Sequence, residues 1–241
     1  MHSTQFFTDK QLEELQVKLQ TIEGRTNNLL LKCTLQSFAN QKAQQFARQG
    51  FGRRIQTVRR CIHRVFEIVP PETVIVPDRN RLFDAQINLQ AFYANVFGAA
   101  DNLAWIWVHE RGLAGQIMPL QVGLRKKNTA VRESFPADFR SYLETMDQWF
   151  EYVTEYRDAL AHRIPLYIPP GAVRESEKAA ANELQARMNA ALDALKPFEY
   201  ERLAAEQAKL FFFYPMMTHS LQETAGIVYF HPQIIADFGV I

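Results

Sequence analysis

The stretch of residues 82–111 constrains the fold of this chain most, because apolar side chains recur along it at helical spacing. Four polar residues recur in it at intervals of seven and so run down one side of the predicted helix: Asn88, Asn95, Asn102 and His109. Gly98 lies on the same side, where it would let another helix approach closely. The helix is apolar around much of its circumference, which favours burial, and buried amides need partners. The series therefore predicts a polar neighbour, and solvated or purely structural polar residues are the alternative.

Similar spacing predicts further helices on both sides of this stretch. One begins at a cap on Thr8 and ends at Gly24, and another covers about residues 53–69 before Pro70-Pro71. The remaining predicted helices cover about residues 27–49 (closed by Gly50), 137–162, 173–195 and 197–210. The composition is 47% hydrophobic over 241 residues, which allows a sizeable core. The chain is therefore predicted to be mainly α-helical.

The character of the sequence changes near its C-terminal end. Residues 210–214 and 226–230 are aromatic and β-branched runs, with Pro215 and Pro232 near their ends. We expect a small β-hairpin there. The chain then divides into N-terminal helices (1–79), a helical core (80–210) and a C-terminal hairpin with a tail (211–241).

Charge is segregated along a chain whose net charge is only +1. Residues 24–66 contain nine Lys or Arg and no Asp or Glu. Such a segment can make a local positive field that attracts a polyanion. Four arginines of the helix predicted over 53–69 are candidates for nucleic-acid binding: Arg53, Arg59, Arg60 and Arg64. A solvated basic surface is the alternative interpretation.

Several functional classes lack support in the sequence. Cys33 and Cys61 form no metal or disulfide pattern, and no phosphate-loop or dinucleotide-binding string is present, so no metal or cofactor is expected. The N-terminus lacks a basic region followed by an apolar one, and no apolar run approaches the ~20 residues of a membrane span. A cytoplasmic protein without a membrane partner is therefore expected.

Candidate chemistry is concentrated near the end of the helix predicted over 137–162. Arg157-Asp158 is followed by His162, shortly before the helix-stopping Pro165. Helical spacing places Arg157 in the apolar stripe that contains Val153. A buried arginine is costly unless it is paired, so Arg157 should have a partner or a ligand. A structural salt bridge would also satisfy that requirement.

The positions of Arg157 and His162 raise a geometric difficulty. Five residues separate them, so on an ideal helix their side chains point about 140° apart. Asp158 and His162 are four residues apart and can interact. Convergence of Arg157 and His162 requires a helix that loosens before Pro165, or a second subunit that completes the site.

The string Arg157-Asp158-x-x-x-His162 resembles the motif of the HEPN superfamily, in which an arginine is followed by four to six residues, the first of them polar, and then by a histidine. The resemblance implies a compact α-helical bundle over residues 80–210, with the other two regions as additions. Many members of that superfamily are metal-independent endoribonucleases of toxin, defence or RNA-processing systems. They commonly dimerise so that two motifs meet in one cleft, and other members are non-catalytic binding modules.

The resemblance also implies roles for particular residues. His162 would act as general base or acid while a ribose 2′-hydroxyl attacks its own phosphate, and Arg157 would stabilise charge on the phosphoryl oxygens. Asp158 would orient His162. Asp101 or Asn102 more loosely resembles a polar position on a neighbouring core helix, where it would position Arg157 or the substrate.

The resemblance implies RNA as the substrate, a homodimer as the active form, and an antitoxin or defence-system protein as a further partner. The acid-free segment 24–66 could hold the RNA backbone. The alternative is a non-catalytic HEPN-like module that binds nucleotide or nucleic acid, or that mediates assembly.

Overall fold

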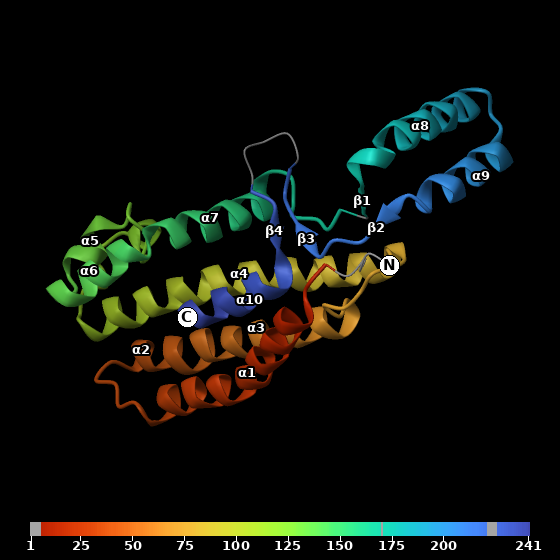
Figure 1. Cartoon of the computed structure of the whole chain (residues 1–241). Helices are drawn as coiled ribbons and strands as arrows, with labels where there is room; N and C mark the ends of the chain where they lie inside the picture. The colour runs from red at the N-terminus through yellow and green to blue at the C-terminus, as the bar shows by residue number, and fades with distance from the viewer. Residues whose placement is uncertain (1–5, 170, 221–225) are drawn as a thin grey trace.

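A computed structural model describes residues 6–169, 171–220 and 226–241, and it is predominantly α-helical, as predicted (Figure 1). The body is built from α1 (Asp9–Leu35), α3 (Gly52–Ile68), α4 (Arg79–Glu110), α7 (Asp147–His162) and α10 (Phe230–Val240). The long helix α4 contacts α3, α7 and α10, and α1 packs against α3 and α10. Side chains from all three predicted regions meet in one apolar core, which includes Ile22, Leu89 and Phe238.

The first helix begins where the sequence predicts. Thr8 Oγ1 accepts from the Gln11 N–H at 3.3 Å, and Gln11 Oε1 accepts from the Thr8 N–H at 2.9 Å, which completes a capping box. The predicted end at Gly24 is wrong, because α1 continues to Leu35. A helix tolerates an interior glycine at a cost of about 1 kcal/mol, and burial of Ile22 and Thr26 on either side offsets that cost.

The helix predicted over 27–49 is also wrong in its limits. The chain leaves α1 after Leu35 and re-enters a helix at α2 (Gln41–Gln45), which the Asn40 side chain caps. A π-helical turn, η1 (Phe46–Phe51), then leads directly into α3. Gly50 therefore ends no helix. It gives room instead, since a Cβ atom there would lie 3.0 Å from Asn102 Nδ2.

The sequence predicts α4 well. Asp78 caps it by accepting from the Arg81 N–H at 3.0 Å, and the chain turns at Gly112, whose φ of +67° favours glycine. A weakly patterned stretch follows and contains only η2 (Pro119–Gln121) and α5 (Thr129–Glu133). In the part of the chain that the structure describes, no helix combines the length and the apolarity that a membrane crossing needs.

The helix predicted over 137–162 is interrupted at Met146, which separates α6 (Ala137–Thr145) from α7. Arg132 stabilises the junction. Its guanidinium donates to the Leu143 carbonyl at 3.3 Å and forms an ion pair with Asp147. Leu143 and Phe150 both remain in a second apolar core beneath the junction. The Leu143 carbonyl, which a continuous helix would have used, thus accepts from the Met146 N–H at 3.1 Å and from the Arg132 side chain.

The chain then forms a projecting arm. The arm consists of η3 (Glu175–Glu177), α8 (Lys178–Asp193) and α9 (Pro197–Ala208), and Figure 1 shows it extending away from the body. Two short antiparallel strands close its base, β1 (Ala172–Val173) and β2 (Phe211–Phe212). The helices predicted over 173–195 and 197–210 are therefore confirmed, with small differences at their ends.

The C-terminal region contains the predicted β-hairpin, built from β3 (Met216–Met217) and β4 (Val228–Tyr229). The strands that pair in this hairpin differ from the two runs that the sequence pattern predicts to pair. The aromatic run 210–214 contributes β2, which pairs with β1 rather than with the second run. Residues 230–240, predicted as a tail, form α10, whose Ile234 and Phe238 are fully or almost fully buried.

Candidate functional site

Arg157 has the partners that its place in an apolar stripe requires. Its guanidinium carbon lies 4.1 Å from the centroid of the Phe97 ring, and its Nη1 lies 3.0 Å from Asp158 Oδ1. The side chain is 31% exposed. Its Nε is buried and makes no hydrogen bond to any described residue. The arginine is thus held by a ring and a carboxylate while its outer part reaches solvent.

A second arginine shares the same ring. The Arg125 guanidinium carbon lies 4.4 Å from the Phe97 centroid, and Arg125 Nη1 lies 3.3 Å from Asp101 Oδ1. The two guanidinium groups are therefore neighbours on one aromatic side chain. We call Arg125 and Arg157 the arginine pair. Asp101, which follows Phe97 by one turn of α4, lies beside both cations.

Asp101 interacts with both members of the arginine pair. Burial raises the pKa of this carboxyl above its usual value, and the charges of Arg125 and Arg157 partly oppose the increase. The carboxyl is therefore a partly buried acidic neighbour that the two cations share. The role that the resemblance implies for Asp101, positioning Arg157 or the substrate, stays a prediction.

Asn102 contacts a different arginine. Arg54, on α3, donates from Nε to Asn102 Oδ1 at 3.1 Å and from Nη1 to Asn95 Oδ1 at 3.3 Å. Asn95 and Asn102 of the polar series thus have the polar neighbour that the sequence predicts, whereas Asn88 donates to the Asp84 carbonyl of its own helix. Gly98 lies between the two asparagines and admits the Arg54 side chain rather than another helix backbone.

His162 is the last residue of α7 and is exposed. The helix remains regular up to this point, since the Arg163 N–H donates to the Ala159 carbonyl at 3.1 Å. No hydrogen bond or ion pair between Asp158 and His162 is present among the described residues. The helix end is therefore not loosened, and Arg157 and His162 diverge within one chain as helical geometry requires.

The acid-free segment meets its counter-charges at its two immediate flanks. Glu23 forms an ion pair with Arg59, and Glu67 lies 2.7 Å from Arg64 and 4.0 Å from Arg60. The fourth predicted arginine, Arg53, is exposed. Arg53, Arg60 and Arg64 all remain at least partly open to solvent, so the face is basic but partly compensated.

A hollow of about 350 Å³ opens beside the arginine pair. Its charged lining residues are Arg125, Lys126, Lys127, Arg163, Asp147, Glu151 and Glu155, and Phe150 and Thr154 complete it. Asp147 is already engaged by Arg132. The hollow extends from Arg125, the one member of the arginine pair that lines it, to Arg163, the residue that follows His162, and it could accept a group the size of a phosphate.

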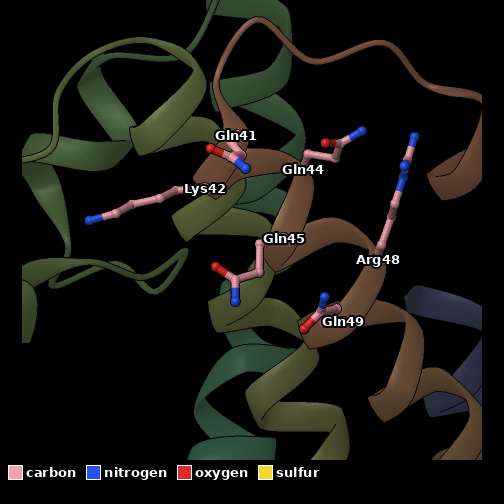
Figure 2. Close-up of a pocket in the computed structure, with 6 residues that line it drawn as sticks. All are labelled: Gln41, Lys42, Gln44, Gln45, Arg48 and Gln49. Carbon is pink, nitrogen blue, oxygen red and sulfur yellow. The ribbon is translucent and has the colours of Figure 1, made fainter.

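A second hollow, of about 520 Å³, lies over α2 and η1 (Figure 2). Its lining is polar and consists of Gln41, Lys42, Gln44, Gln45, Arg48 and Gln49. Figure 2 shows Lys42 and Arg48 pointing in different directions, and Arg48 donates to the Thr34 carbonyl at 2.8 Å. Its two cations therefore do not converge on one point.

The sequence did not single out Phe97 or Arg125 as site residues. Phe97 is adjacent to Gly98 of the polar series, and Arg125 begins the basic string Arg125-Lys126-Lys127, but neither signal indicates that they meet at Arg157. Among the described residues, no group of three His, Cys, Asp or Glu is close enough to hold a metal ion. Comparison with protein-family models, curated proteins and solved structures finds no match to this chain.

Proposed function

We propose that this protein is a metal-independent endoribonuclease of the HEPN type, with an active site that two copies of the chain build together. The observation that best supports this proposal is the arrangement of Arg157 and His162. Arg157 is fixed on Phe97 beside Arg125, and His162 is exposed at the end of the same helix. A toxin or defence role in the cytoplasm, with an antitoxin or defence-system partner, follows from the resemblance alone.

The chemistry requires one proton acceptor and one proton donor. The ribose 2′-hydroxyl attacks the adjacent phosphorus, its proton passes to one His162, and the bond from phosphorus to the 5′-oxygen breaks. The leaving 5′-oxygen takes a proton from the imidazolium that this His162 has become, and the products carry a 2′,3′-cyclic phosphate and a 5′-hydroxyl. The arginine pair stabilises the added negative charge on the phosphoryl oxygens.

A second copy resolves the divergence of Arg157 and His162. Because α7 is regular through His162, a single chain directs the two side chains to different sides of the helix. Two α7 ends related by a twofold axis can bring Arg157 of one copy to His162 of the other. Asp101, Asp158 and Phe97 would then act as positioning residues for the guanidinium groups.

The test is cleavage of assorted RNAs by the purified full chain in the presence of a chelator. We expect His162→Ala and Arg157→Ala each to lower the rate by about 100-fold or more. Arg187→Ala, at an exposed position on α8, is the matched control and should leave the rate unchanged. Cleavage that survives both motif substitutions would refute the proposal.

A mixing experiment tests the shared site. When His162→Ala and Arg157→Ala chains are combined, a heterodimer contains one site with an intact arginine and an intact histidine from different copies. Partial recovery of cleavage is expected. If each chain supplied both groups to its own site, the mixture would stay inactive.

One observation favours the alternative, a non-catalytic module that binds RNA or nucleotide. Within a single chain Arg157 is already occupied by Asp158 and Phe97, which is what a structural arginine requires. This alternative predicts that RNA binds without being cleaved, and that Arg157→Ala lowers the stability of the protein more than its affinity for RNA.

A further inference from the structure

The arm formed by α8 and α9 carries its own small core. Met188, Ala191 and Leu203 are buried between the two helices, and Gln207 Nε2 donates to the Ala181 carbonyl at 3.0 Å across them. Figure 1 shows that both helices run out from the strands at the base to a turn far from the body. The arm is thus a packed helical projection rather than a loose loop.

The tip of this arm exposes large apolar side chains. Leu192, Leu195 and Phe198 are 62%, 86% and 85% exposed. Leu195 also has a φ of +53°, at the position after a helix where glycine is usual. The Leu195 N–H donates to the Leu192 carbonyl and the Lys196 N–H to the Ala191 carbonyl, which completes the standard hydrogen bonds of that turn.

Neither the backbone nor the core of the arm accounts for Leu195. Glycine would relieve the left-handed conformation, and a polar residue would be better solvated. The exposed trio Leu192, Leu195 and Phe198 is therefore a surface whose apolar character needs an external partner. We call these three residues the tip.

An apolar hollow of about 570 Å³ lies at the base of the same arm. Val74, Ile75 and Val76 line one part of it, and Phe211 and Phe212 of β2 line another. Ile75 is 83% exposed, so this surface also lacks a cover within the described part of the chain. We call this hollow the base groove. Its volume is sufficient for one phenylalanine and two leucine side chains.

The charges around the two surfaces are complementary. Asp193 and Glu201 flank the tip, and neither has an ion pair in the described part of the chain. Lys196, within the tip segment, is paired with Glu199 at 3.6 Å, so the unpaired charges there are acidic. Arg174 and Lys209 line the base groove, are exposed, and likewise have no acidic partner among the described residues. The base groove also contains Glu177, so its excess of positive charge is one. An acidic, apolar tip matches a basic, apolar groove.

We propose that the tip docks into the base groove of a second copy of this chain, so that two arms lie side by side and antiparallel. The tip and the base groove lie one arm length apart in each copy. Two antiparallel arms related by a twofold axis can therefore form both tip–groove contacts at the same time. The outer face of α8, which the second arm would cover, presents the exposed side chains Ala179, Glu183, Ala186 and Ala190 at helical spacing. This proposal does not rest on the ribonuclease activity.

The test measures the oligomeric state of the full chain by sedimentation over a wide range of concentrations. Wild-type protein should be dimeric. Leu195→Gly, which suits the backbone, and Phe198→Asp should each weaken dimerisation by about 30-fold or more. Leu120→Asp is the matched control, because this residue is 95% exposed and lies outside the arm. It should leave the dimer unchanged.

Charge exchange makes the test specific to these two surfaces. Asp193→Lys and Lys209→Asp should each weaken the dimer, and the chain that carries both substitutions should recover much of the affinity. A Phe198→Asp chain mixed with a Val74→Asp chain should form a heterodimer through its one intact contact. Failure of both rescues would overturn the proposal.

Two further outcomes would also overturn it. A wild-type chain that is monomeric at every concentration excludes a second copy as the occupant. A monomer that floats with phosphatidylcholine vesicles, and loses this property with Phe198→Asp, would identify lipid as the occupant instead. RNA cleavage measured on the same variants separates this proposal from the proposed activity. A variant that becomes monomeric and still cleaves RNA would support the arm contact and refute the shared active site.

Discussion

A Cβ atom on residue 98 would lie 2.4 Å from the guanidinium carbon of Arg54, so the glycine of α4 is what admits this arginine between Asn95 and Asn102. The three polar side chains join α3 to α4 in the most extensive helix–helix contact of the body. The guanidinium of Arg54 is thereby held between two helices, and two neutral amide oxygens accept its hydrogen bonds in place of a carboxylate.

Gly98→Ala should lower the free energy of unfolding by about 1–3 kcal/mol, because Arg54 must move and lose its bonds to both asparagines. In an Arg54→Ala background the same change should be stabilising by up to about 1 kcal/mol, since alanine favours the helix. Denaturant unfolding of the four proteins in this cycle gives both values.

Gly24→Ala is the matched control for that cycle. This glycine lies in the interior of α1, and apart from the adjacent backbone of α1 no atom lies within 4 Å of the place that an alanine methyl group would occupy, so helix propensity alone should act. The expected result is stabilisation by about 0.5–1 kcal/mol in both backgrounds. A loss of stability in Gly98→Ala that persists without Arg54 would show that the arginine is not the cause.

Glu67→Gln should increase the affinity of the protein for RNA if the arginines of α3 contact phosphates. Glu67 compensates Arg64 and Arg60, and its loss frees both cations. The slope of log affinity against log salt concentration should become steeper, by the amount expected for about one to two additional phosphate contacts. Glu183→Gln changes the net charge equally at an exposed position of α8, and it should have a smaller effect. Equal effects of the two substitutions would argue against this face.

Phe97→Leu should impair the arginine pair while it keeps apolar volume on α4. The ring supports both guanidinium groups, and such contacts are worth about 0.5–2 kcal/mol each. We expect RNA cleavage to fall by about tenfold, and Phe97→Tyr, which keeps the ring, to restore most of it. If Phe97→Leu is as active as the wild type, the Phe97 ring does not contribute to RNA cleavage.

Asp237 provides a pH-dependent contribution to stability in the body. Its carboxylate accepts from Trp149 Nε1 at 3.0 Å, from Gln233 Nε2 at 2.8 Å and from the Tyr93 hydroxyl at 3.2 Å. Burial raises the pKa of Asp237 to about 6, although these three donors oppose the increase. The network joins α10 to α4 and α7.

The sign of the pH effect follows from that raised pKa. Between about pH 4 and pH 6 the folded protein binds a proton at Asp237 more tightly than the unfolded chain does, so this contribution to stability falls as the pH rises. Above the folded pKa the loss is complete, at about 3 kcal/mol. Asp237→Asn should remove this fall, because an amide can accept from Trp149 and Gln233 and donate to Tyr93. Unfolding measured from pH 4 to 7 checks it.

Asp84→Asn serves as the control for Asp237, since this carboxyl is exposed on α4. The free energy of unfolding of Asp84→Asn should depend on pH as that of the wild type does. A variant at Asp237 that also follows the wild type would show that the buried carboxyl does not govern this range.

Local signals in the sequence were sufficient for much of the helical framework. The Thr8 capping box, the stop at Pro70-Pro71 and the turn at Gly112 all depend on backbone chemistry within a few residues. These local signals failed where contacts outside the local segment stabilise the structure. The predicted helix 137–162 is interrupted at Met146, where Arg132 bonds to the Leu143 carbonyl. A glycine at position 24 does not end α1, because packing on both sides stabilises the helix through it.

The candidate site shows the same division. Helical projection alone indicated that Arg157 needs a partner, that His162 diverges from it, and that the asparagines of α4 face a polar group, because spacing along one helix determines direction. Only the tertiary structure decided that Phe97 and Arg125 meet Arg157, that Arg54 is the polar group, and that Glu23 compensates Arg59. Those contacts join elements far apart in the chain, and their free energy comes from packing between helices, which no local pattern specifies.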